Sequence, residues 1–319
     1  MRFSDILGHE KPLNIINAYI EKSCFSGGYI FSGPEGIGKK TVAKIIAQKL
    51  NCTAQIDRPC GSCSSCLKIE KLRHPDLHII ENDASQIKIE DIRNLQREAS
   101  FRPYEGVMKV FIIDDAHRLN PEAANSLLKV LEESPGGSLI ILITHKLQNI
   151  FKTILSRCKV IRFSPLAITV LEDILIKDYL VDRLFARFIS FYAEGRLGLA
   201  VKLKDSKVFE EKNRIFDSFV LSGKPLDRNF TGQSREQLRG CLNILASWFR
   251  DIYLLKAGIS DRELIHLDRE NDLLKLIHEF SFKQLDGILT TISESIFYLE
   301  NNINSKLLLH NLGVQLWKA

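Results

Sequence analysis

The sequence has no long apolar segment and no large excess of charge of either sign. Its longest strongly apolar run is Leu139–Ile143, whereas a membrane-spanning helix needs about 20 such residues. The N-terminal segment MRFSDILGHEKPL lacks the apolar stretch and the small-residue cleavage site of a secretory signal. The net charge of +5 permits a nucleic-acid surface without indicating one, because DNA-binding domains usually concentrate far more basic charge. We therefore expect a cytoplasmic protein that does not span a membrane.

The composition excludes a disordered, collagen-like or low-complexity chain. Hydrophobic residues make up 45% of the sequence and charged residues 26%, as in ordinary globular proteins. At roughly 150 residues per domain, the length of 319 residues suggests two or three domains. In the cytoplasm the seven cysteines would be reduced thiols or metal ligands rather than disulfides.

Short apolar runs alternate with helical patterns in the first half of the chain. The expected strands are residues 29–32, 77–80, 110–113 and 138–144, and the expected helices are 39–50, 89–100 and one that begins at 120–121. Strands that are apolar throughout and alternate with helices indicate a mostly parallel sheet covered on both faces. The first half is therefore predicted to be an α/β domain.

After Ser164-Pro165 the sequence has helical periodicity and contains no convincing strand. A possible capping box, Ser234 with Gln237, precedes the first of two apolar stripes with 4-3-4-3 spacing. The stripes are Leu238, Leu242, Leu245, Phe249 and Ile252, and then Leu285, Leu289, Ile292, Ile296, Leu299 and Ile303. Each stripe would bury one helix face. We favour an internal helix-bundle core over a seam between chains, although the spacing permits both.

A glycine-rich loop, GPEGIGK, lies between an expected strand and an expected helix, which is the context that a phosphate-binding loop requires. The backbone at Gly33, Gly36 and Gly38 would surround phosphates, and Lys39 would reach the β- and γ-phosphates. Lys40 stands where a hydrolysing loop has a Ser or Thr that binds Mg²⁺. The neighbouring Thr41 cannot substitute for that residue, because one step along a helix rotates the side chain by about 100°.

A second nucleotide-site motif follows the strand expected at 110–113. There, Asp114 and Asp115 resemble the acidic pair of an ATPase, in which the first residue supports Mg²⁺ and the second, usually Glu, orients the attacking water. Asp115 is one methylene shorter than Glu. The two departures predict a degenerate site that hydrolyses ATP poorly; whether ATP and Mg²⁺ still bind is left open.

Four of the cysteines, Cys52, Cys60, Cys63 and Cys66, lie close together in the sequence. Four thiolates complete a tetrahedral structural zinc site and leave no position open for catalysis. Iron–sulfur clusters also use the spacing C-x2-C-x2-C, but in ferredoxins a further x3-Cys-Pro follows, whereas here LKIEK does. We favour zinc over an iron–sulfur cluster and over four unliganded thiols.

Several motifs together resemble the bacterial DNA polymerase III clamp-loader subunits of the AAA+ superfamily, over nearly the whole chain. They are FSDILGHE, GPEGIGKKTVA, the four cysteines, FIIDDAHRLNPEAANSLLKVLEESP and ILITHKLQNIFKTILSRCKVIRFSPL. The resemblance implies a RecA-like P-loop domain with an inserted zinc module over residues 1–164, and a helical lid over 165–205. An all-α collar that joins the subunits of a ring would occupy 206–319.

Within this family the departures favour a delta-prime-like subunit over the ATP-hydrolysing gamma/tau type. The active type has GKT or GKS and an Asp-Glu pair, as well as a sensor-2 arginine. Here Gly198 stands where that arginine would be, and Arg196 is about two residues out of register. The resemblance also places Thr144 in the sensor-1 region of the nucleotide site.

The segment Ser156-Arg157-Cys158 matches the motif by which these subunits present an arginine to a neighbour's ATP. The resemblance thus implies that Arg157 acts in trans. Without it, an arginine that binds the carbonyl groups at a helix C-terminus would be the preferred interpretation.

The implied role is in DNA replication, as part of the polymerase III holoenzyme and of a hetero-oligomeric clamp-loader ATPase. The implied partners are gamma/tau and delta subunits and, through the complex, the sliding clamp and primed DNA. We expect no independent catalysis by this chain. The alternatives are a gamma/tau-like ATPase and a zinc-dependent nucleic-acid-binding protein outside a loader; the lack of a concentrated basic and aromatic stretch disfavours the latter.

Overall fold

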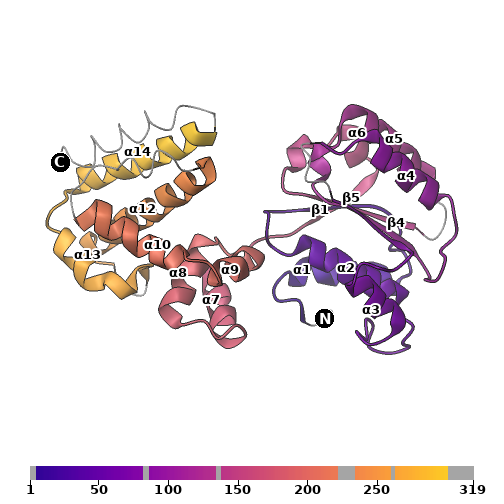
Figure 1. Cartoon of the computed structure of the whole chain (residues 1–319), viewed down its shortest axis with the longest axis horizontal. Coiled ribbons are helices and arrows are strands. Elements are labelled where there is room, and N and C mark those ends of the chain that lie inside the picture. The colour runs from indigo at the N-terminus through magenta and orange to yellow at the C-terminus, as the bar shows by residue number, and fades with distance from the viewer. Residues whose placement is uncertain (1–4, 82–85, 134–137, 222–233, 260–262, 301–319) are drawn as a thin grey trace. The chain divides into compact units, whose positions relative to one another are not determined.

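The computed structural model describes residues 5–81, 86–133, 138–221, 234–259 and 263–300. The contacts divide the chain into two units. The first comprises Met1–Leu166 with Arg196–Gly198, and the second comprises Ala167–Gly195 with Leu199–Ala319 (Figure 1). The finer division into domains at 1–164, 165–205 and 206–319 stays a prediction.

The first unit is built on a parallel five-stranded sheet with the strand order β2-β3-β4-β1-β5. The strands are β1 (Gly27–Ser32), β2 (Leu77–Ile80), β3 (Lys109–Ile113), β4 (Ser138–Thr144) and β5 (Cys158–Arg162). The α/β fold class and four of these strands are as the sequence predicts. The edge strand β5 was not predicted, because the exposed Lys159 and Arg162 interrupt the apolar pattern.

Helices cover both faces of this sheet (Figure 1). One face carries α1 (Glu10–Glu21), α2 (Lys39–Asn51) and α3 (Ser64–Glu70), and the other carries α4 (Ile89–Ala99), α5 (Pro121–Glu133) and α6 (Lys152–Leu155). Two short 3-10 helices, Ala116–Arg118 (η2) and Leu147–Asn149 (η3), follow β3 and β4. The predicted start of α5 is confirmed, since Asn120 Oδ1 accepts a hydrogen bond from the backbone N–H of Ala123 at 2.8 Å.

The position of β4 between two layers of helices explains why its sequence is apolar throughout. Leu139, Ile141 and Ile143 pack into the core on the α1–α3 face, and Ile140 and Leu142 pack into the core on the opposite face. Successive side chains of a strand point to opposite faces, so a strand covered on both sides needs apolar residues at every position.

Among its described residues, the second unit contains helices joined by turns and loops, and no strand. Its elements are α7 (Ile168–Lys177), α8 (Arg183–Tyr192), most of α9 (Leu197–Lys204), α10 (Val208–Ile215), the π-helix η4 (Phe216–Leu221), α12 (Arg235–Lys256), the 3-10 helix η6 (Leu267–Arg269), α13 (Glu270–Leu276) and α14 (Phe282–Glu300). The capping box is confirmed: Gln237 N–H donates to Ser234 Oγ at 3.3 Å, and Ser234 N–H donates to Gln237 Oε1 at 2.9 Å. Among the described helices, none is long and apolar enough to cross a membrane.

The two apolar stripes belong to α12 and α14, which pack against each other. All five members of the α12 stripe are buried. In α14, Leu285, Ile292 and Leu299 are buried, and Leu289 and Ile296 are half-buried. Ile303 lies outside the described residues. The α12 stripe therefore forms part of the core of its own unit, as favoured above.

Candidate nucleotide and metal sites

The phosphate loop connects β1 to α2, as predicted. Gly36 (φ 77°) and Gly38 (φ 96°) adopt left-handed backbone conformations, which glycine reaches without the steric cost that a side chain would add. Gly38 is the N-cap of α2, so the loop ends at a helix N-terminus. Because the strands are parallel, this loop lies at the same edge of the sheet as the carboxyl ends of β3 and β4.

The ammonium group of Lys39 is bound by the loop itself. Its side chain is buried, and Nζ donates to the carbonyl oxygens of Gly33 and Pro34, both at 2.6 Å. Burial lowers the pKa of Lys39, against the opposing effect of Asp114 and other acidic groups. A phosphate bound in the loop would have to replace these carbonyl oxygens as the partner of Lys39.

Lys40 connects two carboxylates at the edge of the sheet. Its Nζ lies 2.5 Å from Glu81 Oε2 and 3.4 Å from Asp114 Oδ2. Glu81 directly follows β2 and Asp114 directly follows β3, so the pairing of these strands brings the two carboxylates together. Asp114 is the residue expected to support Mg²⁺. A divalent cation at its carboxylate would therefore be repelled by the Lys40 ammonium.

Asp115, the second acidic residue, turns toward a group that sequence analysis missed. Its Oδ1 lies 3.5 Å from His145 Nδ1 and 3.9 Å from His117 Nδ1, and its Oδ2 lies 3.3 Å from Arg118. The backbone of Asp115 is left-handed, with φ 50°. The signal in the sequence was a histidine shortly after each of two strand ends, in DDAH and ITH.

Thr144 is the last residue of β4 and is fully buried. Its Oγ1 lies 3.4 Å from His117 Nδ1 and accepts a hydrogen bond from the backbone N–H of Lys146 at 3.0 Å. The hydroxyl is thus engaged by residues that flank the site, and its sensor-1 role stays a prediction.

Gly198, at the expected position of the sensor-2 arginine, contacts the phosphate loop within the first unit. Its N–H donates to the carbonyl oxygen of Gly36 at 2.8 Å, and a Cβ at this position would lie 2.6 Å from the same oxygen. No side chain fits there unless the backbone moves.

Arg157 follows α6 and is bound within the chain. Its Nε and NH2 contact Glu132 Oε1 at 2.7 and 2.5 Å, and NH1 donates to the carbonyl oxygen of Thr153 at 3.1 Å. The contact with Thr153 is the binding of a carbonyl group at a helix C-terminus, which is the alternative to a role in trans. The side chain nevertheless remains 37% exposed, and its action in trans stays a prediction.

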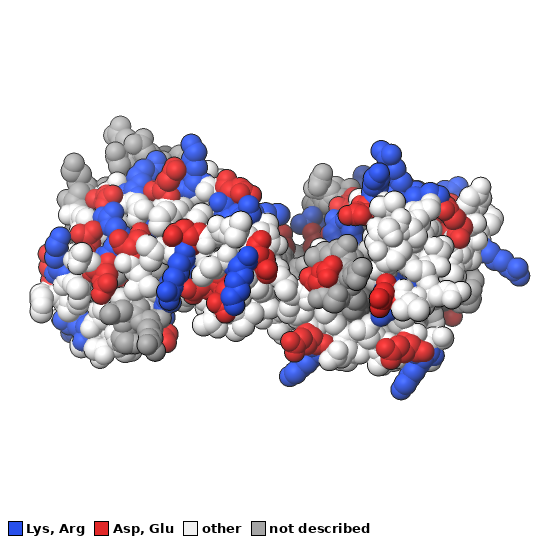
Figure 2. Space-filling model, turned by 90° about the horizontal axis from the view of Figure 1, so that it is seen from below, with Lys and Arg blue, Asp and Glu red and all other residues white. Residues whose placement is uncertain are grey.

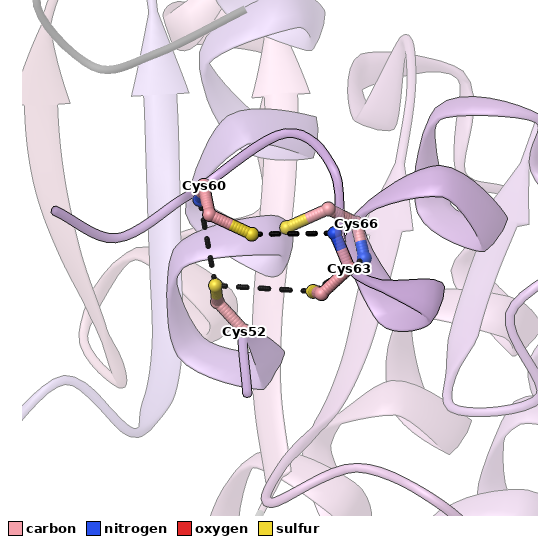
Figure 3. Close-up of side chains that lie close together, drawn as sticks. All are labelled: Cys52, Cys60, Cys63 and Cys66. Atoms are coloured by element: carbon pink, nitrogen blue, oxygen red, sulfur yellow. Dashed lines mark hydrogen bonds between the residues drawn. The ribbon is translucent and has the colours of Figure 1, made fainter. Parts of the chain in front are cut away.

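The four cysteines come together in a compact group, with their sulfurs directed toward one another (Figure 3). Cys52 follows α2, Cys60 and Cys63 lie in the loop, and Cys66 is in α3. The Sγ atoms of Cys52 and Cys63 are 3.9 Å apart. A tetrahedral zinc ion with Zn–S bonds of about 2.3 Å separates its sulfurs by about 3.8 Å. The group could therefore hold a metal ion of this kind.

Backbone hydrogen bonds favour thiolates in part of this group. The N–H of Cys60 donates to Cys52 Sγ at 3.4 Å, and the N–H of Cys63 donates to Cys60 Sγ at 3.3 Å. The N–H of Cys66 donates to Cys63 Sγ at 3.4 Å. Burial raises the pKa of Cys63, but hydrogen bonds from the N–H groups of Cys66 and Thr53 outweigh it and lower the pKa to about 5. Burial raises the pKa of Cys66. Four sulfur donors suit zinc and exclude Mg²⁺ or Ca²⁺, which prefer oxygen.

Two family models match the sequence. "DNA polymerase III, delta subunit" matches residues 8–167, and "DNA polymerase III, delta subunit, C terminal" matches residues 232–316. The chain is 30% identical over 324 residues to DNA polymerase III subunit delta' of Bacillus subtilis (strain 168), which covers 96% of this chain and 95% of that protein. The chain belongs to the DNA polymerase III delta-subunit family. The resemblance found in the sequence is thereby confirmed.

The chain is also similar to gamma subunits. The chain is 31% identical over 288 residues to DNA polymerase III subunit gamma of Buchnera aphidicola subsp. Baizongia pistaciae (strain Bp), covering 88% of this chain and 75% of that protein. A solved structure of a DNA polymerase III gamma subunit-related protein from Thermotoga maritima aligns with a TM-score of 0.46 and 19% identity, covering 96% of this chain and 98% of the other.

Proposed function

We propose that this chain is a delta-prime-like subunit of the bacterial DNA polymerase III clamp loader. Its partners would be gamma/tau and delta subunits, and the complex would load the sliding clamp onto primed DNA. The 30% identity to a delta' subunit along 95% of that protein supports this function. The observation that carries the proposal is the ion pair of Lys40 with Asp114, because it places a positive charge at the carboxylate expected to support Mg²⁺.

The chain would therefore contribute to ATP hydrolysis without performing it efficiently. Phosphoryl transfer depends on Mg²⁺, which bridges the phosphates and neutralises their developing charge. Lys40 opposes that ion, and Asp115 is engaged with His145 and Arg118. The catalytic contribution would be Arg157, supplied in trans to a neighbouring subunit's ATP.

A gamma/tau-like ATPase is the second candidate. The intact loop geometry, the presence of Lys39 and the 31% identity to a gamma subunit favour it. A nucleic-acid-binding protein outside a loader has less support. On the face drawn in Figure 2, Lys and Arg side chains lie among Asp and Glu rather than in a continuous basic stripe.

The four cysteines would hold a structural zinc ion, with Cys52, Cys60, Cys63 and Cys66 as ligands. Zinc bound there would fix the loop between α2 and α3 by linking Cys52, which directly follows α2, to Cys66 in α3. Reduced thiols fit the cytoplasmic location that the sequence predicts.

ATP turnover by the purified chain alone, with Mg²⁺ and primed DNA present, separates the first two candidates. We expect no turnover above the background of the preparation. That background should be the same in Lys39→Ala and in Lys44→Ala, the latter being a matched change on the same helix. Turnover that disappears in Lys39→Ala but persists in Lys44→Ala would identify an ATPase and reject the delta-prime-like function.

The degenerate magnesium position can be tested with Lys40→Thr. The change removes the ammonium group from Asp114 and places a hydroxyl where hydrolysing loops have one. We expect Mg²⁺ to strengthen ATP binding by the variant about tenfold more than binding by the unchanged chain, which corresponds to about 1.4 kcal/mol. Calorimetric titration with Mg²⁺ or with EDTA measures this. Equal magnesium dependence in both proteins would show that Lys40 does not control the metal.

A further inference from the structure

A second group of metal-binding residues lies at the sheet edge, apart from the cysteines. One ligand atom from each of Asp115, His117 and His145 lies within 4.8 Å of the other two. His117 is in η2, which follows β3, and His145 directly follows β4. Because β3 and β4 are parallel neighbours, their carboxyl ends bring the three side chains together.

The distances in this group suit a shared ion better than direct hydrogen bonds. Asp115 Oδ1 is 3.5 Å from His145 Nδ1 and 3.9 Å from His117 Nδ1, whereas hydrogen bonds between such atoms are about 2.7–3.2 Å long. Two ligands of one tetrahedral ion, each bound at about 2.1 Å, lie about 3.4 Å apart. The two imidazole rings meet edge to face, with centroids 4.4 Å apart.

The donor set also indicates the kind of ion. Imidazole nitrogens suit zinc, cobalt and nickel, whereas Mg²⁺ prefers an all-oxygen set. Arg118 lies 3.3 Å from Oδ2 of Asp115, the oxygen opposite Oδ1, which faces the two histidines, and this contact would help to fix the carboxylate. Arg118 and the neighbouring Lys146 are positively charged, and their charge lowers the affinity for any cation.

We propose that Asp115, His117 and His145 form a binding site for a divalent transition-metal ion such as Zn²⁺ or Co²⁺, distinct from the cysteine group. Three protein ligands leave a fourth position for water or for a phosphate oxygen. The site lies at the same edge of the sheet as the phosphate loop, because β1, β3 and β4 are parallel and their carboxyl ends share that edge.

Cobalt binding to the 319-residue chain, first loaded with only one equivalent of zinc for the cysteines, tests this site. We expect about one further Co²⁺ per chain, with the weak visible bands of nitrogen and oxygen ligands and without the strong charge-transfer bands of thiolates. His145→Ala, at a side chain only 23% exposed, should lose that ion. His278→Ala, at an exposed histidine of α13's C-terminal flank, should retain it.

Two additions make the result independent of folding and of the cysteines. His117→Asn keeps a polar side chain of similar shape, and circular dichroism establishes that each variant is folded. In Cys63→Ser, the Co²⁺ with nitrogen and oxygen ligands should remain. The proposal is overturned if the unchanged chain binds no ion with this spectrum, or if folded His145→Ala and His117→Asn both keep it.

Discussion

Cys63→Ser is expected to release zinc and to destabilise the first unit. An ion that binds only the folded chain stabilises it by about 4 kcal/mol when its free concentration is about 1,000 times the dissociation constant, and the variant would lose that contribution. Cys63 is central to the group, because its N–H approaches Cys60 Sγ and its own Sγ approaches Cys52. Metal analysis and denaturant unfolding, each with and without a chelator, measure the two effects.

Cys24→Ser is the matched control for this experiment. Cys24 is exposed and lies outside the cysteine group, with its Sγ donating to the carbonyl oxygen of Lys22. This variant should keep its zinc and its stability, and a chelator should destabilise it as much as the unchanged chain. If Cys63→Ser retains one zinc ion per chain, the ligand assignment is wrong.

In the absence of denaturant the structural change should be local, although the free energy of unfolding falls for the whole first unit. The sheet has a continuous apolar core on each face, formed by residues such as Ile112 and Ile141 on one side and Phe111 and Ile140 on the other. These contacts do not include the segment between Cys52 and Cys63. We therefore expect the sheet to remain folded while hydrogen exchange increases in that segment.

Local order along the chain was largely predictable from the sequence. The strand at 138–144 is recognisable because a buried parallel strand needs apolar residues at every position. The edge strand β5 was missed for the converse reason, since exposed residues such as Lys159 and Arg162 carry no penalty there. Short-range patterns thus predict buried elements well and exposed ones poorly.

Pairings between distant residues were less accessible. The sequence shows that Lys40 departs from one nucleotide-site motif and that Asp114 matches another. The 3.4 Å contact between their side chains, however, depends on how α2 lies against β3. The group of Asp115 and His145 depends on the alignment of β3 with β4. No spacing along the chain encodes that alignment, so these residues became a candidate site only in the folded structure.

Arg157→Ala is expected to slow ATP turnover by the loader reconstituted with its partner subunits, while assembly is unchanged. An arginine supplied in trans contributes about 10³ to 10⁵ in rate in GTPases, so we expect a loss of about 10³ or more at the neighbouring site. Steady-state turnover with the clamp and primed DNA measures it. Arg162→Ala, a change of an exposed arginine in the adjacent strand β5, is the matched control and should leave turnover unchanged.

The contacts of Arg157 within the chain make this prediction more specific. Glu132 holds two nitrogens of the guanidinium group, and a neighbour's phosphate would have to replace that carboxylate. Glu132→Ala should therefore retain turnover or increase it. If Arg157 only stabilises the end of α6 through Thr153, the Arg157→Ala loader would unfold more easily yet hydrolyse ATP at the normal rate. Arg157→Lys separates charge from geometry, because a lysine keeps the positive charge but cannot make the two-pronged contact with a phosphate.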